Sequence, residues 1–229
     1  MTIVSIKIGA EGDLRRVELS DGSFLSFRTC YLPQPFDESL YNLDGIDTAE
    51  GRELDHDEEE GFRFASACFG AEKTALRLIA RAEQTAFGLS RKLKNRGRDP
   101  ACVAMVISRL YELELLDDGR YARLWLESRI NRQASSPLRL LAALRSRGID
   151  RDDAESALKK VLDDDAEQRL LERFMQKRQR GHKNGAWGLR PAKAASPTMD
   201  DEAARRSRKY LLRSEGFSSL AIELFFEGC

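Results

Sequence analysis

The spacing of apolar positions along this chain changes once, from every second residue to every third or fourth. The first thirty residues follow the shorter spacing, which is typical of half-buried strands. The segments with this spacing are Thr2–Ile8, Leu14–Leu19 and Ser23–Thr29. Along the first segment, Val4, Ile6 and Ile8 are expected to share one buried face. Together the segments predict a small antiparallel β-sheet that packs on the helices that follow it.

The dipeptide Asp21-Gly22 separates the last two segments and predicts a tight hairpin in which both residues have positive φ. Residues 33–61 then lose all periodicity, contain two prolines and carry the acidic run Asp55–Glu60. Such a composition indicates a solvated connector or the frayed start of a helix.

From about Gly61 onward the apolar residues repeat with helical spacing. Within this region one motif occurs three times: a basic helix end, a glycine, one residue and then a capping side chain. Its copies are Leu93–Asp99, Leu144–Asp150 and Leu212–Ser218. Glycine can adopt the left-handed conformation that closes a helix, and Asp or Ser two residues later can cap the next one. The motif therefore predicts one helix–turn–helix joint built three times, at Gly97, Gly148 and Gly216.

The distances between these joints indicate tandem repeats. They are 51 and 68 residues, and the excess of 17 is close to the 19 residues of an insert containing Gly and Pro at 181–199. Each unit of about fifty residues holds three helices, and we expect neighbouring units to bury their apolar faces by stacking. The predicted divisions are a sheet at 1–32, an acidic connector at 33–61 and three-helix repeats at 62–116, 117–163 and 164–229. The predicted fold is mostly α, an elongated array of three-helix units with a small N-terminal antiparallel sheet.

Charge is distributed unevenly along the chain. The formal net charge is zero, but residues 1–70 hold 6 Lys/Arg and 15 Asp/Glu, whereas residues 71–229 hold the other 32 and 23. A basic helical body favours a polyanion or an acidic protein surface as partner. The sequence has no run of about 18 apolar residues that could span a membrane, and its start lacks the pattern of a secretory signal. We therefore expect a cytoplasmic protein.

Nothing in the sequence indicates catalysis. His56 lies in the acidic run and His182 lies in the insert, so neither is expected on a rigid scaffold. A phosphate-binding glycine loop and a serine nucleophile elbow are both absent from the sequence. The four scattered cysteines are Cys30, Cys68, Cys102 and Cys229. They are expected to be reduced thiols that serve as small apolar residues. We expect no enzyme activity, no cofactor and no metal.

One segment carries a family resemblance. Leu115–Ala122 reads Leu-Leu-Asp-Asp-Gly-Arg-Tyr-Ala and resembles the signature Gly-Leu-Leu-Asp-Asp-x-Arg-[Phe/Tyr]-Ala of the RecX family of recombination regulators. Ser128-Arg129 resembles the family's Arg-Ser-Arg stretch. Pro137–Ile149 is similar to its Gly-Pro-x-Arg-Ile-x-x-Glu-Leu-x-x-Lys-Gly-Ile segment. The resemblance covers residues 70–216 well and residues 1–30 more loosely.

The resemblance has departures. Glu114 stands where the family has the glycine before Leu-Leu-Asp-Asp, Ser136 replaces the glycine of Gly-Pro, and Ala143 replaces a glutamate. The first two departures lie at expected helix ends, where the fold tolerates them. The insert at 181–199 is longer than the corresponding part of the family pattern.

The resemblance implies a protein that binds the RecA recombinase filament on DNA and lies along its helical groove. Such a protein restrains ATP hydrolysis, filament extension and strand exchange in DNA repair, homologous recombination and the SOS response. We expect a monomer that also meets single- or double-stranded DNA without sequence preference.

Basic residues near the first two joints and on the helix between them are the candidate surface for partner or DNA binding. They are Arg91, Lys92, Lys94, Arg96, Arg98, Arg120, Arg123, Arg129, Arg132, Arg139, Arg145 and Arg147. Pairs three residues apart, such as Arg129 and Arg132, face one way on a helix. Each residue alone is also consistent with an ordinary surface charge, whereas contacts with phosphates by the whole set would depend strongly on salt.

Two further pairs of residues have alternative interpretations. Asp117 and Asp118 are expected to cap the first helix of the second repeat, and contact with a basic patch on a partner is the alternative. Tyr121 and Trp125 lie on the apolar face of that helix, where we expect them in the core, and stacking on nucleic-acid bases is the alternative.

A function of another class is sequence-specific DNA binding, because three-helix units with tight joints resemble helix-turn-helix modules. Against it, the basic charge is spread over several helices and is not concentrated on one recognition helix. A scaffold whose partner is any acidic protein surface is a third interpretation. Gel shifts with random duplex and single-stranded DNA across salt concentrations discriminate, because weak, sequence-blind binding favours the regulator.

Overall fold

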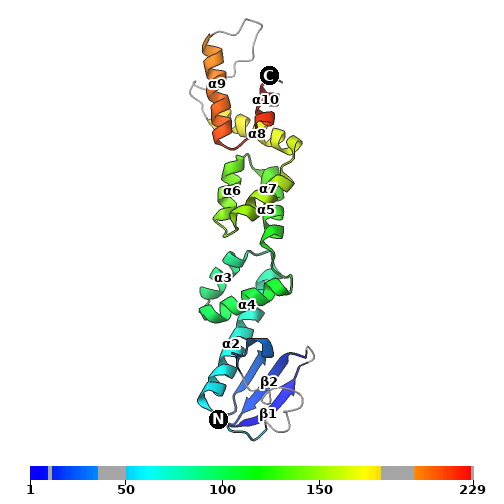
Figure 1. The fold of residues 1–229 in the computed structure, drawn as a ribbon, viewed down its shortest axis with the longest axis vertical. Coiled ribbons are helices and arrows are strands. Elements are labelled where there is room, and N and C mark those ends of the chain that lie inside the picture. Colours follow the sequence, from blue (N-terminus) through cyan, green and yellow to red (C-terminus); the bar gives the residue numbers. More distant parts are fainter. Residues whose placement is uncertain (10–11, 36–49, 182–198, 228–229) are drawn as a thin grey trace. The chain divides into compact units, whose positions relative to one another are not determined.

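The computed structural model describes residues 1–9, 12–35, 50–181 and 199–227. The chain divides into two compact units, Met1–Asp117 and Asp118–Cys229. Its elements are β1 (Ile3–Ile8), β2 (Leu14–Leu19), β3 (Phe24–Arg28), the 3-10 helix η1 (Thr29–Tyr31), α2 (His56–Ile79), α3 (Ala86–Lys94), α4 (Pro100–Glu112), α5 (Asp118–Arg132), α6 (Pro137–Arg145), α7 (Arg151–Val161), α8 (Asp164–Gly181), α9 (Met199–Ser214) and α10 (Ser219–Glu227) (Figure 1). The predicted fold class, mostly α with three-helix units and a small N-terminal antiparallel sheet, is confirmed. The elongated arrangement of the units and the boundaries of the repeats stay predictions.

The sheet has the strand order β1-β2-β3, and both pairings are antiparallel. The predicted face of β1 is wrong at Val4, which is 50% exposed; Ile6 is buried as predicted, and Ile3 is buried with it. A bulge causes the change, because Ile3 pairs with Leu19 and Ser5 already pairs with Glu18. An extra residue between paired positions shifts the alternation of faces, and period-two counting cannot detect it.

The hairpin between β2 and β3 is confirmed, but its predicted turn type is wrong. Only Gly22 has positive φ (77°), whereas Asp21 does not. Gly22 donates its backbone N–H to the carbonyl of Leu19 (2.9 Å), and the Asp21 carboxylate accepts from the backbone N–H of Ser23 (2.9 Å). A turn followed by one left-handed glycine makes a three-residue loop, so a single residue with positive φ is enough.

Helix α2 begins earlier than the sequence pattern predicts, at His56 instead of Gly61. Asp55 caps it, accepting from the backbone N–H of Glu58 (2.8 Å), while the Glu58 carboxylate accepts from the backbone N–H of Asp55 (3.0 Å). This reciprocal capping box and the acidic first turn complement the positive end of the helix dipole. Part of the acidic run is therefore a helix start; residues 36–49 of the predicted connector lie outside the described residues.

The first unit has one continuous core that joins the sheet to α2, α3 and α4. The rings of Phe27 on β3 and Phe62 on α2 stack with centroids 5.0 Å apart. Beside this core, Arg28 of β3 donates to the buried carboxylate of Glu72 on α2 (3.0 Å) and pairs with Asp13 (2.7 Å). Arg109 of α4 pairs with Asp13 as well (2.9 Å). This ion network ties the sheet to both helices.

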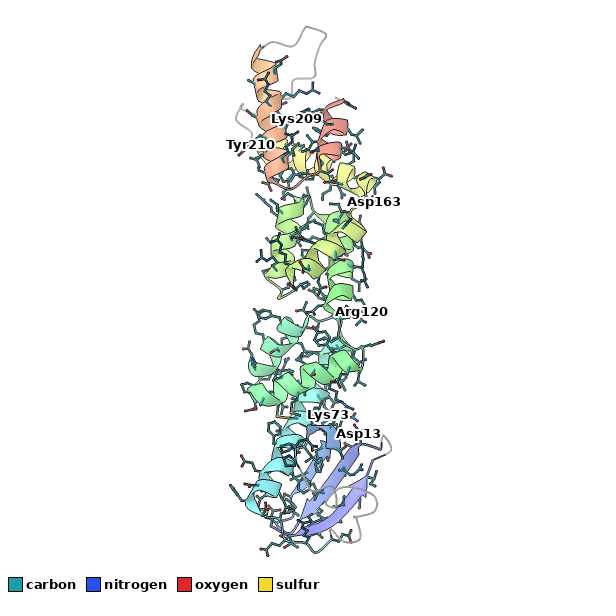
Figure 2. All side chains as sticks on the ribbon, in the orientation of Figure 1. Asp13, Lys73, Arg120, Asp163, Lys209 and Tyr210 are labelled. Carbon is teal, nitrogen blue, oxygen red and sulfur yellow. A yellow bond between two sulfur atoms is a disulfide. The ribbon has the colours of Figure 1, made fainter. Side chains whose placement is uncertain are left out.

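The expectation that all cysteines are reduced is wrong for one pair. Cys68 on α2 and Cys102 on α4 form a disulfide, visible as a yellow bond in Figure 2, with their Cα atoms 4.6 Å apart. Both residues are buried. The packing of α2 against α4 brings together two residues that are 34 positions apart, which sequence spacing could not show. Cys30 is free.

The second unit holds the helices α5 to α10. Helix α7 packs on α5 and α6, and α10 packs on α8 and α9 (Figure 1). Tyr121 and Trp125 are partly buried against its core, as expected. Most of the predicted insert, residues 182–198, lies outside the described residues. In the described part of the chain, no helix is long and apolar enough to cross a bilayer.

All three predicted joints are confirmed. The glycines have φ values of 74° (Gly97), 82° (Gly148) and 87° (Gly216). In each joint the residue after the glycine donates its N–H to the carbonyl of the leucine five positions earlier, at 3.2–3.3 Å. This hydrogen bond is the mark of a Schellman motif.

The predicted side-chain caps at the joints also form. Asp99 accepts from the backbone N–H of Ala101 (2.7 Å), and Ser218 accepts from that of Ala221 (3.1 Å). Asp150 accepts from the backbone N–H of Arg151 (2.7 Å).

A fourth joint of the same kind lies between α4 and α5, where Glu114 has φ of 55°. Leu115 donates its backbone N–H to the carbonyl of Leu110 (3.0 Å), as in the other joints. The RecX pattern has a glycine at this position, and the left-handed conformation gives the physical reason for it. Helix α5 then begins at Asp118, so Asp117 immediately precedes its first residue.

Candidate functional site

The candidate basic residues of the first unit surround the Gly97 joint. Arg91, Lys94 and Arg96 are exposed. Lys92 donates to the side-chain oxygen of Gln84 (2.6 Å), so its ammonium group is held against the loop before α3. Arg98 points back to α2, where its guanidinium lies 3.4 Å from the hydroxyl of Thr74. The exposed cations of this set thus lie on α3 and its end, whereas Arg98 takes part in the packing of the joint.

In the second unit the structure brings together two candidate arginines through Trp125. The guanidinium carbon of Arg147 lies 4.5 Å from the centre of the Trp125 ring, and that of Arg129 lies 5.6 Å from it. Arg147 also donates to the carbonyl of Ala143 (2.6 Å), which fixes its position at the end of α6. The indole holds two cations from α5 and from the Gly148 joint, and such cation–π contacts contribute about 0.5–1 kcal/mol each at exposed sites.

The other candidate residues of the second unit lie apart from this cluster. Arg120 and Arg123 are half-buried on α5, and Arg132 is exposed at its end. Arg139 on α6 is exposed and forms an ion pair with Glu215 (3.6 Å). Arg145, also on α6, is exposed. The predicted set therefore forms several separate groups of cations, and the Arg129–Trp125–Arg147 cluster is the one that the second unit assembles around an aromatic ring.

A recurring position links the three joints. The residue three positions before the joint glycine is Lys94 in α3, Arg145 in α6 and Arg213 in α9, and all three are exposed. The middle helix of each three-helix unit thus ends with a cation at the same place. A basic helix end also complements the negative end of the helix dipole, which accounts for part of the preference.

The sequence analysis missed the basic residues of α9. They are Arg205, Arg206, Arg208, Lys209 and Arg213. The sequence contains the signal, because α9 precedes its joint glycine as α3 and α6 do. The insert at 181–199 lengthens the spacing before Gly216, so α9 is harder to align with α3 and α6 from the sequence.

Two features of the described residues bear on reactivity: possible metal ligands and the free cysteine. No group of three or more His, Cys, Asp or Glu side chains in the described ranges could hold a metal ion. Burial raises the pKa of the free Cys30 thiol, although Arg109 beside it acts in the opposite direction. Cys30 is therefore predominantly a thiol at neutral pH and a poor nucleophile.

Comparisons with known proteins place these features in a family. A family model described as "RecX, second three-helix domain" matches residues 117–158. The chain is 39% identical over 120 residues to "Regulatory protein RecX" of Treponema pallidum (strain Nichols), covering 52% of this chain and 73% of that protein. It is 36% identical over 150 residues to "Regulatory protein RecX" of Mycobacterium sp. (strain JLS), covering 65% of this chain and 76% of that protein.

Solved structures agree on the fold. A crystal structure of regulatory protein RecX superposes with a TM-score of 0.66 at 19% identity, covering 99% of this chain and 98% of that one. RecX from Lactobacillus salivarius superposes with a TM-score of 0.53 at 19% identity, covering 72% and 97%. The signature Leu115–Ala122, the repeated joints and these matches agree: the chain belongs to the RecX family of regulatory proteins.

Proposed function

We propose that this RecX-type regulator binds the RecA recombinase filament on DNA and inhibits ATP hydrolysis, filament extension and strand exchange. The observation that carries the proposal is the similarity of more than half of the chain to proteins named "Regulatory protein RecX". The protein acts as a cytoplasmic monomer, by binding and without chemistry of its own.

The repeated position of the exposed cations supports this proposal physically. Lys94, Arg145 and Arg213 occupy one place in three successive units of the sequence. A filament presents the same surface again and again along its length, so a chain of similar units can offer the same contact more than once. Linked contacts of modest strength add up to a tight complex, because each one raises the local concentration of the next.

The test is ATP hydrolysis by RecA on single-stranded DNA, titrated with this protein at substoichiometric ratios. The expected result is a progressive loss of hydrolysis well below one protein per recombinase, because a block to extension acts at few sites on a long filament. Hydrolysis that stays constant up to equimolar protein would contradict the proposal.

The binding surface is tested with charge-removing variants. Lys94→Gln combined with Arg145→Gln removes two of the recurring cations, and it should raise the concentration for half-inhibition about tenfold if each contact contributes about 0.7 kcal/mol. Lys159→Gln combined with Lys160→Gln removes two exposed cations from α7 and is the matched control, with unchanged inhibition expected. Equal effects of the two double variants would show that net charge alone matters.

The alternative of sequence-specific helix-turn-helix binding is favoured by the tight joints between three-helix units. It predicts that one duplex sequence competes far better than random duplex at moderate salt. The spread of cations over α3, α5, α6 and α9 argues against a single recognition helix. A selection from random duplexes that yields a consensus sequence would favour this alternative over the filament regulator.

A further inference from the structure

The outward face of α9 combines an exposed aromatic ring with cations. Arg206, Tyr210 and Arg213 stand at positions i, i+4 and i+7, so they share one face of the helix. Tyr210 is 76% exposed, and both arginines are exposed. No other large apolar or aromatic side chain in the described residues is as exposed as Tyr210.

Side chains on the other side of α9 contact α10. Arg205 donates to the backbone carbonyl of Phe226 (3.0 Å), and the charged groups of Arg205 and Lys209 lie 5.4 and 5.6 Å from the centre of the Phe226 ring. Lys209 also pairs with Glu223, and this hydrogen bond holds the pKa of that carboxyl below its usual range. Figure 2 shows Lys209 on the side of α10 and Tyr210 on the side turned away from it. The Arg206–Tyr210–Arg213 face is thus presented outward by a helix held in place.

A comparison with α6 shows that this face differs from a docking surface between repeats. Leu138 of α6 stands ten positions before the joint glycine Gly148. It packs against Gly216, the glycine of the joint that follows α9. The same position in α9 is Arg206. The last unit of a repeat array needs a polar outer side for solubility, and this need explains an arginine at that position. It does not explain an exposed tyrosine. Arg206 forms an exposed i,i+4 ion pair with Glu202 (3.4 Å), a weak contact that a phosphate can displace, and from Ala203 to Ser214 the helix has no carboxylate.

The surroundings of Tyr210 decide between a protein and a nucleic acid as partner. An aromatic anchor in a protein interface normally lies in a well-packed pocket from which the surrounding contacts exclude water. Around Tyr210, the outward positions are Arg206, Ser207, Arg213 and Ser214. Single-stranded nucleic acid needs this combination, an aromatic ring on which a base can stack and cations for the neighbouring phosphates.

We propose that the outward face of α9 binds single-stranded nucleic acid, with Tyr210 stacked on a base and with Arg206 and Arg213 on the flanking phosphates. This contact does not require the recombinase, so its test uses the full chain alone and is separate from the ATP hydrolysis test above.

The first experiment isolates stacking. Binding of an oligothymidine strand at low salt is measured by fluorescence anisotropy, with polyphosphate as a second ligand that has charge but no bases. Tyr210→Ala should weaken oligothymidine binding about tenfold, within the range known for one stacked base, and should leave polyphosphate binding unchanged. Tyr210→Phe keeps the ring and should bind like the original protein. Because Tyr210 is largely exposed, neither change should affect folding, which circular dichroism verifies.

The second experiment isolates the charges. Arg206→Gln combined with Arg213→Gln should lower the slope of log affinity against log salt for oligothymidine by about 1.4, since each phosphate contact on a single strand contributes about 0.7. Lys159→Gln combined with Lys160→Gln is the matched control and should leave the slope unchanged.

Three results would overturn the proposal. The first is an original protein that does not bind oligothymidine at low salt. The second is Tyr210→Ala that binds as tightly as the original protein, or that loses polyphosphate binding to the same degree. The third concerns polyglutamate, measured as a further ligand in the same assay. If Tyr210→Ala weakens polyglutamate binding as much as oligothymidine binding, the face binds an acidic protein surface.

Discussion

The Gly97 joint and the Gly216 joint have the same backbone and different surroundings. In both, the residue after the glycine donates to the leucine carbonyl at 3.2 Å, and the glycine itself donates to the carbonyl three residues earlier, at 2.9 and 3.0 Å. A Cβ atom added to Gly97 would meet no described atom within 4 Å. One added to Gly216 would lie 2.9 Å from Cγ of Leu138 and 3.4 Å from its backbone nitrogen. The glycine of the first joint has open space around it, whereas the glycine of the third packs against α6.

Glu215 joins the third joint to the start of α6, within the second unit. Its backbone carbonyl accepts from the N–H of Leu138 (3.2 Å), and its carboxylate accepts from the buried hydroxyl of Ser136. The carboxylate also lies 3.6 Å from Arg139. The equivalent positions in the other joints are Arg96 and Arg147. The glutamate at this position therefore gives the third joint contacts with α6 that an arginine could not make in the same way.

Among variants of the joints, Gly216→Ala is expected to lower the free energy of unfolding most. The left-handed conformation costs about 1 kcal/mol for alanine, and crowding at Leu138 adds about 1–2 kcal/mol. Urea unfolding should therefore show a loss of about 2–3 kcal/mol in the free energy of unfolding. A loss equal to that of Gly97→Ala would mean that Leu138 yields without cost.

Glu215→Ala should come next. It leaves the buried Ser136 hydroxyl without its acceptor, at a cost of about 1–2 kcal/mol in the free energy of unfolding. Glu215→Gln is the control, because its amide oxygen can still accept and only the partly exposed ion pair with Arg139 is lost, a loss of about 0.5 kcal/mol. If both variants unfold at the same urea concentration, the hydrogen bond to Ser136 does not contribute.

Gly97→Ala should destabilise by about 1 kcal/mol, because only the left-handed backbone is strained and no neighbour is crowded. Thermal unfolding followed by circular dichroism measures the change. A loss as large as that of Gly216→Ala would show that a side chain at position 97 is crowded as well.

Glu114→Gly should have the smallest effect, and in the stabilising direction. It relieves a non-glycine residue of positive φ, but glycine makes the unfolded chain more flexible, so the net gain is about 0.5 kcal/mol in the free energy of unfolding. The expected result is a slightly higher urea midpoint. A lower midpoint would mean that the Glu114 side chain stabilises this joint by more than its backbone strain.

The candidate site was predictable only in part. The sequence identified the basic residues near two joints, because charge and its distance from a glycine are local properties. It could not show that Arg147 reaches Trp125, or that Arg98 turns back to α2, because both depend on packing between helices. It also placed Tyr121 and Trp125 on the apolar face without showing that Trp125 contacts two cations there.

What the sequence by itself determined are the features that depend on neighbours within a few residues: the three strands, the helix ends at the three joints and the left-handed glycines at 97, 148 and 216. Their hydrogen bonds close over five residues, so the local sequence is sufficient. The tertiary structure alone decided the bulge that exposes Val4, the Cys68–Cys102 disulfide and the docking of Gly216 on Leu138. Each of these joins residues far apart in the chain, and their proximity follows from how the elements pack, which no local pattern contains.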